Sequence, residues 1–161
     1  MEKAVFVGRF QPLHNGHVNA IRNIIEQDDI DHLHIIIGSA DKKDTDSNPL
    51  SFETRKDIIS KSLQNLIENR QISISGLDDC TDDDEWIKNL RQIAPDATVA
   101  YSGNGWTRRC MEPFCKVEDP DFLDKEILNG TNIRLRIKEK KEIKHLVPVK
   151  VFEILSKDRY K

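Results

Sequence analysis

The sequence is short of cysteine, of excess basic charge and of long apolar runs, and each shortage excludes a class of protein. Its three cysteines are an odd number and lack the spacing of a metal site, so we expect reduced thiols in a cytoplasmic protein. Lys and Arg number 25 against 28 Asp and Glu, and the net charge of −3 argues against a general nucleic-acid binder. No apolar run approaches the length of a membrane span, and the first residues lack the apolar core of a signal peptide.

Short apolar runs alternate with helical patterns along the chain. The runs predict buried strands at 4–7, 33–37, 72–74 and 98–101, and a weaker fifth at 114–117. The spacing of apolar residues predicts helices at 16–27, from 52 to about 67, around 86–93, at 132–141 and from 147 onward. Strands that alternate with helices favour a parallel α/β sheet, and 161 residues suit a single domain over residues 1–161.

Three of the expected strands end in sequences that suit a ligand site. The first runs into Gly8–Phe10, the second into Gly38–Ala40 and the fourth into Ser102–Asn104. Open parallel sheets bind ligands beyond the carboxyl ends of their strands, so three such breaks on one edge favour a nucleotide pocket. The alternative is that these glycines only mark the ends of strands.

Two histidines, His14 and His17, follow the first strand where a helix is expected to begin. A strand that breaks at a glycine and restarts as a helix leaves backbone N–H groups free to bind an anion. One helical turn places both imidazoles on a common face, and Arg9 adds a positive charge. Zinc binding is the alternative, but no third ligand is nearby in the sequence. The pattern predicts a polyphosphate site in which imidazole N–H groups stabilise the charge on a departing pyrophosphate.

The stretch from Gly8 to His17 closely resembles the signature of the archaeal-type nicotinamide-nucleotide adenylyltransferases. Those enzymes belong to the nucleotidyltransferase superfamily that is marked by His-x-Gly-His. The four-residue motif alone indicates the reaction type, whereas the longer Gly-Arg-Phe-Gln-Pro form is more specific. Further segments are similar to the family in the same order: Gly38–Ala40, Asn48–Pro49, Arg55, Trp86, Ser102–Asn104, Gly130–Arg134 and Leu146–Pro148.

The resemblance implies an α/β, Rossmann-like open parallel sheet with helices on both faces. It implies adenylyl transfer from ATP to nicotinamide mononucleotide, giving NAD and pyrophosphate, by in-line attack of the mononucleotide 5′-phosphate on the ATP α-phosphate. Mg2+ is expected to bridge the phosphates, held mainly by ATP and water rather than by a protein metal site. A cytoplasmic homo-oligomer, such as a hexamer, with no nucleic-acid or membrane partner is also expected.

Site residues carry over from the family position by position. Arg134 lies one turn into a capped helix, where its planar guanidinium suits bidentate phosphate binding, whereas Arg136 projects to a different side. The expected catalytic residues are Arg9, His14, His17 and Arg134. The expected ATP- or NAD-binding residues are Gly8, Phe10, Gln11, Gly38, Ser39, Ser102, Gly103, Asn104, Thr131 and Ile133. The expected mononucleotide-binding residues are Arg55, Asp83 and Trp86.

Two positions depart from the family pattern. Asn129 stands where the family has serine, and asparagine can still cap the helix that follows. Asp83 stands where an asparagine would help to recognise the carboxamide. A carboxylate accepts a hydrogen bond from an amide but repels another carboxylate, so we expect a preference for nicotinamide over nicotinate mononucleotide.

The two tryptophans each allow two interpretations. Trp86 is expected to offer a partly open face to the nicotinamide ring, because it lies at a helix start beside a polar loop. It also shares an apolar helix face with Leu90 and Ile93, which is typical of a core position. Trp106 follows the turn after the fourth strand and is open to the same two interpretations.

Other functions stay open on the sequence alone. The same chemistry could serve another phosphorylated acceptor, such as nicotinate mononucleotide or a phosphopantetheine-like compound, although Trp86 favours a flat aromatic one. A protein that binds NAD or ATP without turnover is a second alternative, against which His14, His17 and Arg134 argue. A flavodoxin-like electron carrier is a third, but it would have no use for the histidine pair.

Overall fold

The computed structural model describes residues 1–69 and 71–157, and its centre is a five-stranded parallel sheet. The order across the sheet is β3-β2-β1-β4-β5, so the first three strands run outward to one side and the last two to the other. The five strands expected from the apolar runs are all confirmed. They are β1 (Glu2–Gly8), β2 (Ile30–Ile37), β3 (Ile72–Gly76), β4 (Val99–Tyr101) and β5 (Lys116–Glu118).

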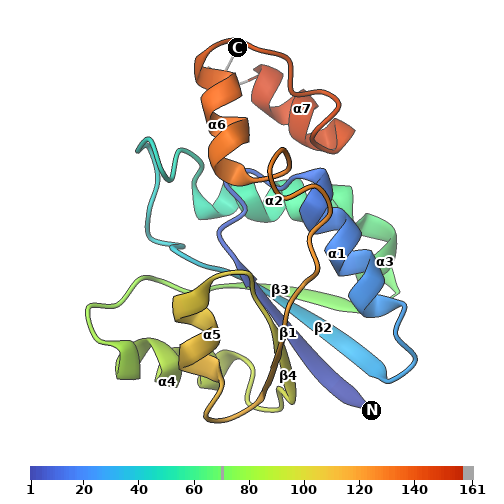
Figure 1. The fold of residues 1–161 in the computed structure, drawn as a ribbon, viewed down its shortest axis with the longest axis vertical. Helices are drawn as coiled ribbons and strands as arrows, with labels where there is room; N and C mark the ends of the chain where they lie inside the picture. Colours follow the sequence, from blue (N-terminus) through green and yellow to red (C-terminus); the bar gives the residue numbers. More distant parts are fainter. Residues whose placement is uncertain (70, 158–161) are drawn as a thin grey trace.

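Helices cover both faces of the sheet (Figure 1). The helices α4 and α5 pack on one face, and α1, α2, α6 and α7 contribute to the core on the other. Within residues 1–69 and 71–157, no helix is long and apolar enough to cross a membrane. The helices are α1 (Asn15–Ile25), α2 (Phe52–Ser62), α3 (Gln64–Glu68), α4 (Asp83–Ile93), α5 (Gly105–Met111), α6 (Gly130–Lys138) and α7 (Val149–Lys157).

The side chains of β1 show why both faces must be covered. Ala4 and Phe6 join the larger core cluster, whereas Val5 and Val7 join the cluster formed with α4 and α5. All four are buried. A parallel strand that is apolar on both sides needs helices on both sides, which confirms the Rossmann-like arrangement.

The helices differ from expectation at two places in the middle of the chain. The long helix expected from 52 to about 67 is broken, because Leu63 leaves helical geometry (φ −117°, ψ 23°) between α2 and α3. Helix α5 is not expected from the sequence, where Ser102–Asn104 is interpreted as a turn only. The side chain of Asn104 accepts a hydrogen bond from Thr107 N–H (3.0 Å), so this turn is also a helix N-cap.

The bounds of the two C-terminal helices differ from expectation. Helix α6 ends at Lys138 rather than at 141, and Lys140 takes a left-handed conformation (φ 57°) that a helix cannot contain. Helix α7 begins at Val149, two residues after the expected start.

The carboxyl ends of the central strands meet at one edge. Gly8 is paired with Ile37, and Gly38 N–H donates to the Gly8 carbonyl (2.8 Å). On the other side of β1, Phe6 is paired with Tyr101, the last residue before Ser102–Asn104. The strand order reverses between β1 and β4, and open α/β sheets bind ligands at such a point.

Candidate active site

His14 and His17 cap the first helix for each other. His14 Nδ1 accepts a hydrogen bond from His17 N–H (3.3 Å), and His17 Nδ1 accepts one from His14 N–H (3.1 Å). The two rings are stacked with centroids 3.6 Å apart. Because each Nδ1 is an acceptor, each neutral imidazole carries its proton on Nε2. The cap therefore sets the tautomer in which Nε2–H can donate to a ligand.

Burial keeps both imidazoles uncharged. His14 is only 3% exposed, and burial lowers its pKa from 6.5 to about 4. Burial also lowers the pKa of His17, and the charge that His14 would carry lowers it further. Two stacked imidazolium cations would repel each other, so the pair acts as two neutral N–H donors near pH 7.

Gly16, between the two histidines, makes room for this stack. A Cβ at Gly16 would lie 2.9 Å from two atoms of the His14 ring, closer than van der Waals contact allows. Any larger residue would push the His14 ring away from its cap.

The chain turns sharply between β1 and the histidines. Phe10 is in the left-handed region (φ 53°), and its ring packs on His17 with centroids 4.7 Å apart. The Gln11 side chain donates to the Leu50 carbonyl and accepts from the Leu50 N–H, both at 2.9 Å. The Gln11 amide is buried and holds the turn, so its side chain is not available for the predicted nucleotide contact.

Arg134 joins this turn from the other end of the sequence. Its Nη1 donates to the Gln11 carbonyl (3.0 Å), and its Nη2 donates to Thr131 Oγ1 (3.3 Å). A Cβ at Gly130 would lie 2.7 Å from Arg134 Nη1, so glycine leaves the space that the guanidinium uses. Burial lowers the pKa of Arg134, and the nearby positive charge of Arg9 lowers it further. Arg9 and Arg134 therefore lie close enough to repel each other.

A cleft lies beside Arg134, between the loop before α2 and helix α6. Its volume is about 730 Å3. Arg9 donates to Asn48 Oδ1 (3.2 Å), which ties that loop to the end of β1. Neither imidazole lines this cleft. The lining residues are Asp44, Thr45, Asp46, Ser47, Pro49, Thr131, Arg134, Leu135, Ile137, Lys138 and Lys140.

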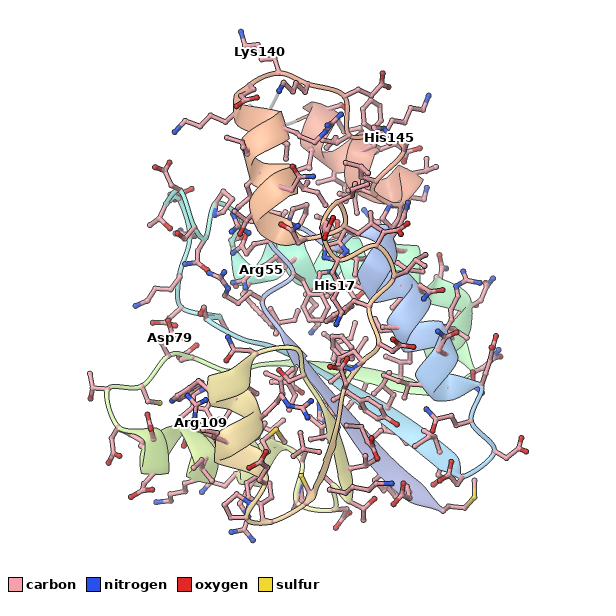
Figure 2. All side chains as sticks on the ribbon, in the orientation of Figure 1. His17, Arg55, Asp79, Arg109, Lys140 and His145 are labelled. Atoms are coloured by element: carbon pink, nitrogen blue, oxygen red, sulfur yellow. The ribbon has the colours of Figure 1, made fainter. Side chains whose placement is uncertain are left out.

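Figure 2 shows the depth of the site within the molecule. His17 and Arg55 lie where the strands end beneath α6, whereas Lys140 lies at the far end of α6. The cleft is lined by Arg134 on α6 and reaches Lys140, just beyond the end of that helix.

Arg55 does not face a ligand, which corrects the prediction that it binds the mononucleotide. Its side chain is 0% exposed. The guanidinium donates to the carbonyls of Arg9 (3.0 Å), Gly38 (2.8 Å) and Ser39 (3.0 Å), and further bonds reach Ser51 and Lys42. Burial lowers the pKa of Arg55, and the charge of Arg9 adds to this effect. Arg55 joins the ends of β1 and β2 from α2.

Two other predicted contacts are also buried. Trp86 is 4% exposed and packs on the ring of Trp106, with centroids 4.7 Å apart and an angle of 61°. The expectation of an open Trp86 face is wrong, since α5 places Trp106, 37% exposed, against it. Ile133 is 0% exposed, so only its backbone remains for the predicted nucleotide contact.

The remaining predicted residues lie along the shared edge of the sheet. Ser39 is in the left-handed region (φ 49°) and donates to Asp79 Oδ1 (2.8 Å). Ser102 is buried, and its Oγ accepts from Asn104 N–H (3.1 Å). Asp83 is exposed in the first turn of α4. The pairing of β1 with β2 and β4 brings the ends of these three strands together, as predicted.

One residue at the site was missed by the sequence analysis. The ring of Phe122 lies edge-on against His17, with centroids 5.8 Å apart, and against His14 at 6.5 Å. It belongs to the segment between β5 and α6, which has no regular pattern of apolar residues. No signal in the sequence placed it beside the histidines, because that contact spans more than 100 residues.

The residues present do not form a metal site. Within the described part of the chain, no group of three or more His, Cys, Asp or Glu side chains could hold a metal ion.

Comparison with known proteins agrees with this geometry. Residues 5–123 match the cytidylyltransferase-like family. The chain is 30% identical over 155 residues to the nicotinamide-nucleotide adenylyltransferase of Methanococcus aeolicus, covering 96% of this chain and 88% of that protein. It is also 30% identical over 162 residues to the enzyme of the same name from Pyrococcus furiosus, covering 99% of this chain and 85% of that protein.

Solved structures share the fold. A bifunctional NMN adenylyltransferase/ADP ribose pyrophosphatase from Francisella tularensis superposes with a TM-score of 0.80 at 23% identity, over 99% of this chain. The match covers 51% of the Francisella chain, so this chain spans about half of that protein. A second structure of the Francisella protein, with AMP and a manganese ion, gives a TM-score of 0.77.

Two findings assign the family. The family model matches residues 5–123, and the two relatives are matched over 88% and 85% of their own lengths. The chain therefore belongs to the cytidylyltransferase-like family and, within it, to the nicotinamide-nucleotide adenylyltransferases.

Proposed function

We propose that this chain transfers the adenylyl group of ATP to nicotinamide mononucleotide, releasing NAD and pyrophosphate. The observation that carries the proposal is the pair of neutral, Nε2-protonated imidazoles at the switch point, next to the turn that Arg134 holds. An anionic ligand meets donors and cations there, and the relatives that match the whole chain are named for this reaction.

The chemistry asks little of the protein beyond positioning and electrostatics. An oxygen of the mononucleotide 5′-phosphate attacks the α-phosphorus of ATP in line with the leaving group, so it needs no general base. The new P–O bond forms as the bond from the α-phosphorus to the β-phosphate oxygen breaks, and pyrophosphate takes the bonding pair. His14 and His17 donate Nε2–H groups to oxygens on which charge develops.

Arg9 and Arg134 act on the β- and γ-phosphates. Arg134 reaches the wall of the 730 Å3 cleft, which is the open space adjoining the histidine turn. A guanidinium there can bind two phosphate oxygens at once and neutralise the departing pyrophosphate. We propose that the triphosphate enters this cleft and that Mg2+ arrives already bound to it, as part of the MgATP substrate.

The mononucleotide would meet the outer side of the α4–α5 pair. Trp106 is the more exposed of the two tryptophans, and its ring is supported by the buried Trp86 beneath it. We propose that Trp106 stacks on the cationic nicotinamide ring and that the exposed Asp83 accepts from the carboxamide. A nicotinate carboxylate would be repelled at Asp83, so nicotinamide mononucleotide is the preferred acceptor.

The assembly and the compartment follow from the resemblance. We propose a cytoplasmic homo-oligomer such as a hexamer, with a single domain over residues 1–161 in each subunit. Light scattering of the purified protein tests the subunit number.

Matched arginine variants test the proposed function. We expect Arg134→Ala to lower kcat/KM for ATP by roughly 100-fold, because a cation that stabilises the leaving group is lost. Arg136 lies two residues further and donates to the Glu142 carbonyl (2.9 Å), so Arg136→Ala should stay within about threefold of the wild type. Pyrophosphate release from ATP and nicotinamide mononucleotide is the measurement.

The same assay decides between acceptors and between classes of function. Wild-type protein that binds ATP but releases no pyrophosphate with any acceptor would be a nucleotide-binding protein rather than an enzyme. Comparable kcat/KM for nicotinamide and nicotinate mononucleotide would contradict the role given to Asp83. Turnover with 4′-phosphopantetheine alone would contradict the aromatic acceptor.

A further inference from the structure

The imidazoles that should contact substrate are covered by one side chain. The ring of Phe122 lies edge-on against three aromatic rings, with centroids 5.8 Å from His17, 6.5 Å from His14 and 6.1 Å from Phe6. His14 is 3% exposed, whereas His17 is partly exposed. A shift of the Phe122 ring would open the buried His14 ring to a ligand.

Phe122 also closes the side of the site nearest to β4. A Cβ at Gly103 would lie 2.9 Å from the Phe122 ring, so the ring rests directly on the turn after β4. Gly103 is the residue that permits this contact. The ring thus lies between the β4 turn and the histidine pair, in contact with both.

The segment that carries Phe122 has few other attachments. In the part of the chain that the structure describes, the hydrogen bonds given for residues 119–126 stay within the segment or reach Ile127, Leu128 and Asn129. Asp121 and Asp124, on either side of Phe122, are in the left-handed region (φ 53° and 46°), which costs energy for a residue other than glycine. Leu123 is 51% exposed. The orange segment below α6 in Figure 1 is anchored at its ends by the buried Pro120 and Leu128, and between them mainly by Phe122.

Asn129 is the second attachment. Its Oδ1 caps α6 by accepting from Asn132 N–H (2.8 Å). Its Nδ2 donates to the carbonyls of Lys125 (2.9 Å) and Glu126 (3.2 Å). A serine could make the cap but could not hold both carbonyls while doing so, because its hydroxyl has one proton.

We propose that residues 119–128 form a cover over the histidine pair, closed by Phe122 in the ligand-free protein, and that binding of the ATP triphosphate displaces the Phe122 ring. This inference rests on the proposed function, since it takes ATP as the ligand. Only molecules with an open cover bind ATP, so the apparent affinity is the intrinsic affinity multiplied by the open fraction. A smaller side chain at position 122 should therefore tighten ATP binding. If Phe122 instead contacted bound ATP, the same change would weaken binding.

The test is calorimetric titration of ATP into wild type, Phe122→Ala, Phe122→Leu and Asn129→Ser, without acceptor. We expect Phe122→Ala to lower the Kd for ATP by roughly fivefold and Phe122→Leu to lower it less. Asn129→Ser keeps the helix cap but loses the two carbonyl contacts, so it should also lower the Kd. Hydrogen exchange of residues 119–128 should rise in wild type when ATP is added.

The outcomes separate this inference from the proposed function. If wild type does not bind ATP, the proposed function fails. If wild type binds ATP but the phenylalanine variants bind it equally or more weakly, the cover fails and the proposed function stands. If the alanine variant does not fold, the leucine and Asn129→Ser variants decide the sign. Unchanged exchange of residues 119–128 with ATP would likewise overturn the cover.

Discussion

His14 both caps α1 and belongs to the proposed active site, so its protonation affects the stability of the fold as well as the site. The pKa of His14 is lowered from 6.5 to about 4, so between these values the unfolded chain binds a proton that the folded chain does not. His14 therefore contributes stability above pH 6.5, and this contribution is lost as the pH falls towards 4. The neutral form that donates through Nε2 and accepts through Nδ1 is also the form that burial favours.

We expect His14→Asn to flatten the pH dependence of stability. From pH 7.5 to pH 5, the His14 contribution to the free energy of unfolding should fall by roughly 2 kcal/mol in wild type, at about 1.4 kcal/mol per pKa unit. Asparagine can accept the His17 N–H bond but does not titrate. Urea unfolding at the two pH values measures the difference, and equal losses in wild type and variant would contradict the assignment.

At the scale of elements, the Arg55 side chain on α2 binds the chain ends that follow β1 and β2 through hydrogen bonds. The side chain is fully buried, and in the described residues no carboxylate forms a salt bridge with it. Its bonds go to backbone carbonyls at the ends of the two strands. The positive charge of Arg55 is therefore buried beneath the loops after β1 and β2, which are the loops that would surround a polyphosphate.

We expect Arg55→Met to lower the free energy of unfolding by about 3 kcal/mol, because several buried carbonyls lose their donor. Lys61→Met is the matched control: it removes an exposed ion pair with Asp57 from the same helix and should cost no more than about 0.5 kcal/mol. Urea unfolding of both variants checks the prediction. A loss below about 1 kcal/mol for Arg55→Met would show that water replaces the guanidinium.

Apolar patterns in the sequence predicted the strands better than they predicted the ends of helices. The three central strands were predicted because they are buried on both faces and therefore read as continuous apolar runs. Helix α5 was missed because its start, Ser102–Asn104, has the composition of a turn. The break at Leu63 was missed because the apolar residues continue past it into α3.

At the scale of the molecule, a positive site lies in a chain of net charge −3. Arg9, Arg55 and Arg134 lie close enough together for the charge of Arg9 to lower the pKa of the other two. Such a cluster raises the local concentration of a polyanion, and salt screens that attraction.

We expect the KM for ATP to rise severalfold between 50 and 500 mM KCl, roughly, with kcat nearly unchanged, since screening acts mainly on encounter and binding. The KM for the singly phosphorylated mononucleotide should rise less. Steady-state kinetics at the two salt concentrations measures both. An equal rise for the two substrates would indicate a general effect of salt on the protein rather than the arginine cluster.

The sequence by itself determined the parallel sheet, the histidine pair at its first strand end and the family, because these depend on local patterns and contiguous motifs. It also predicted the capped helix start that carries Arg134, since a helix cap is a local signal. Only the tertiary structure decided that Gln11, Arg55, Trp86 and Ile133 point inward and that Phe122 lies on the histidines. Side-chain exposure depends on which distant segment packs against a residue, and no local pattern contains that information.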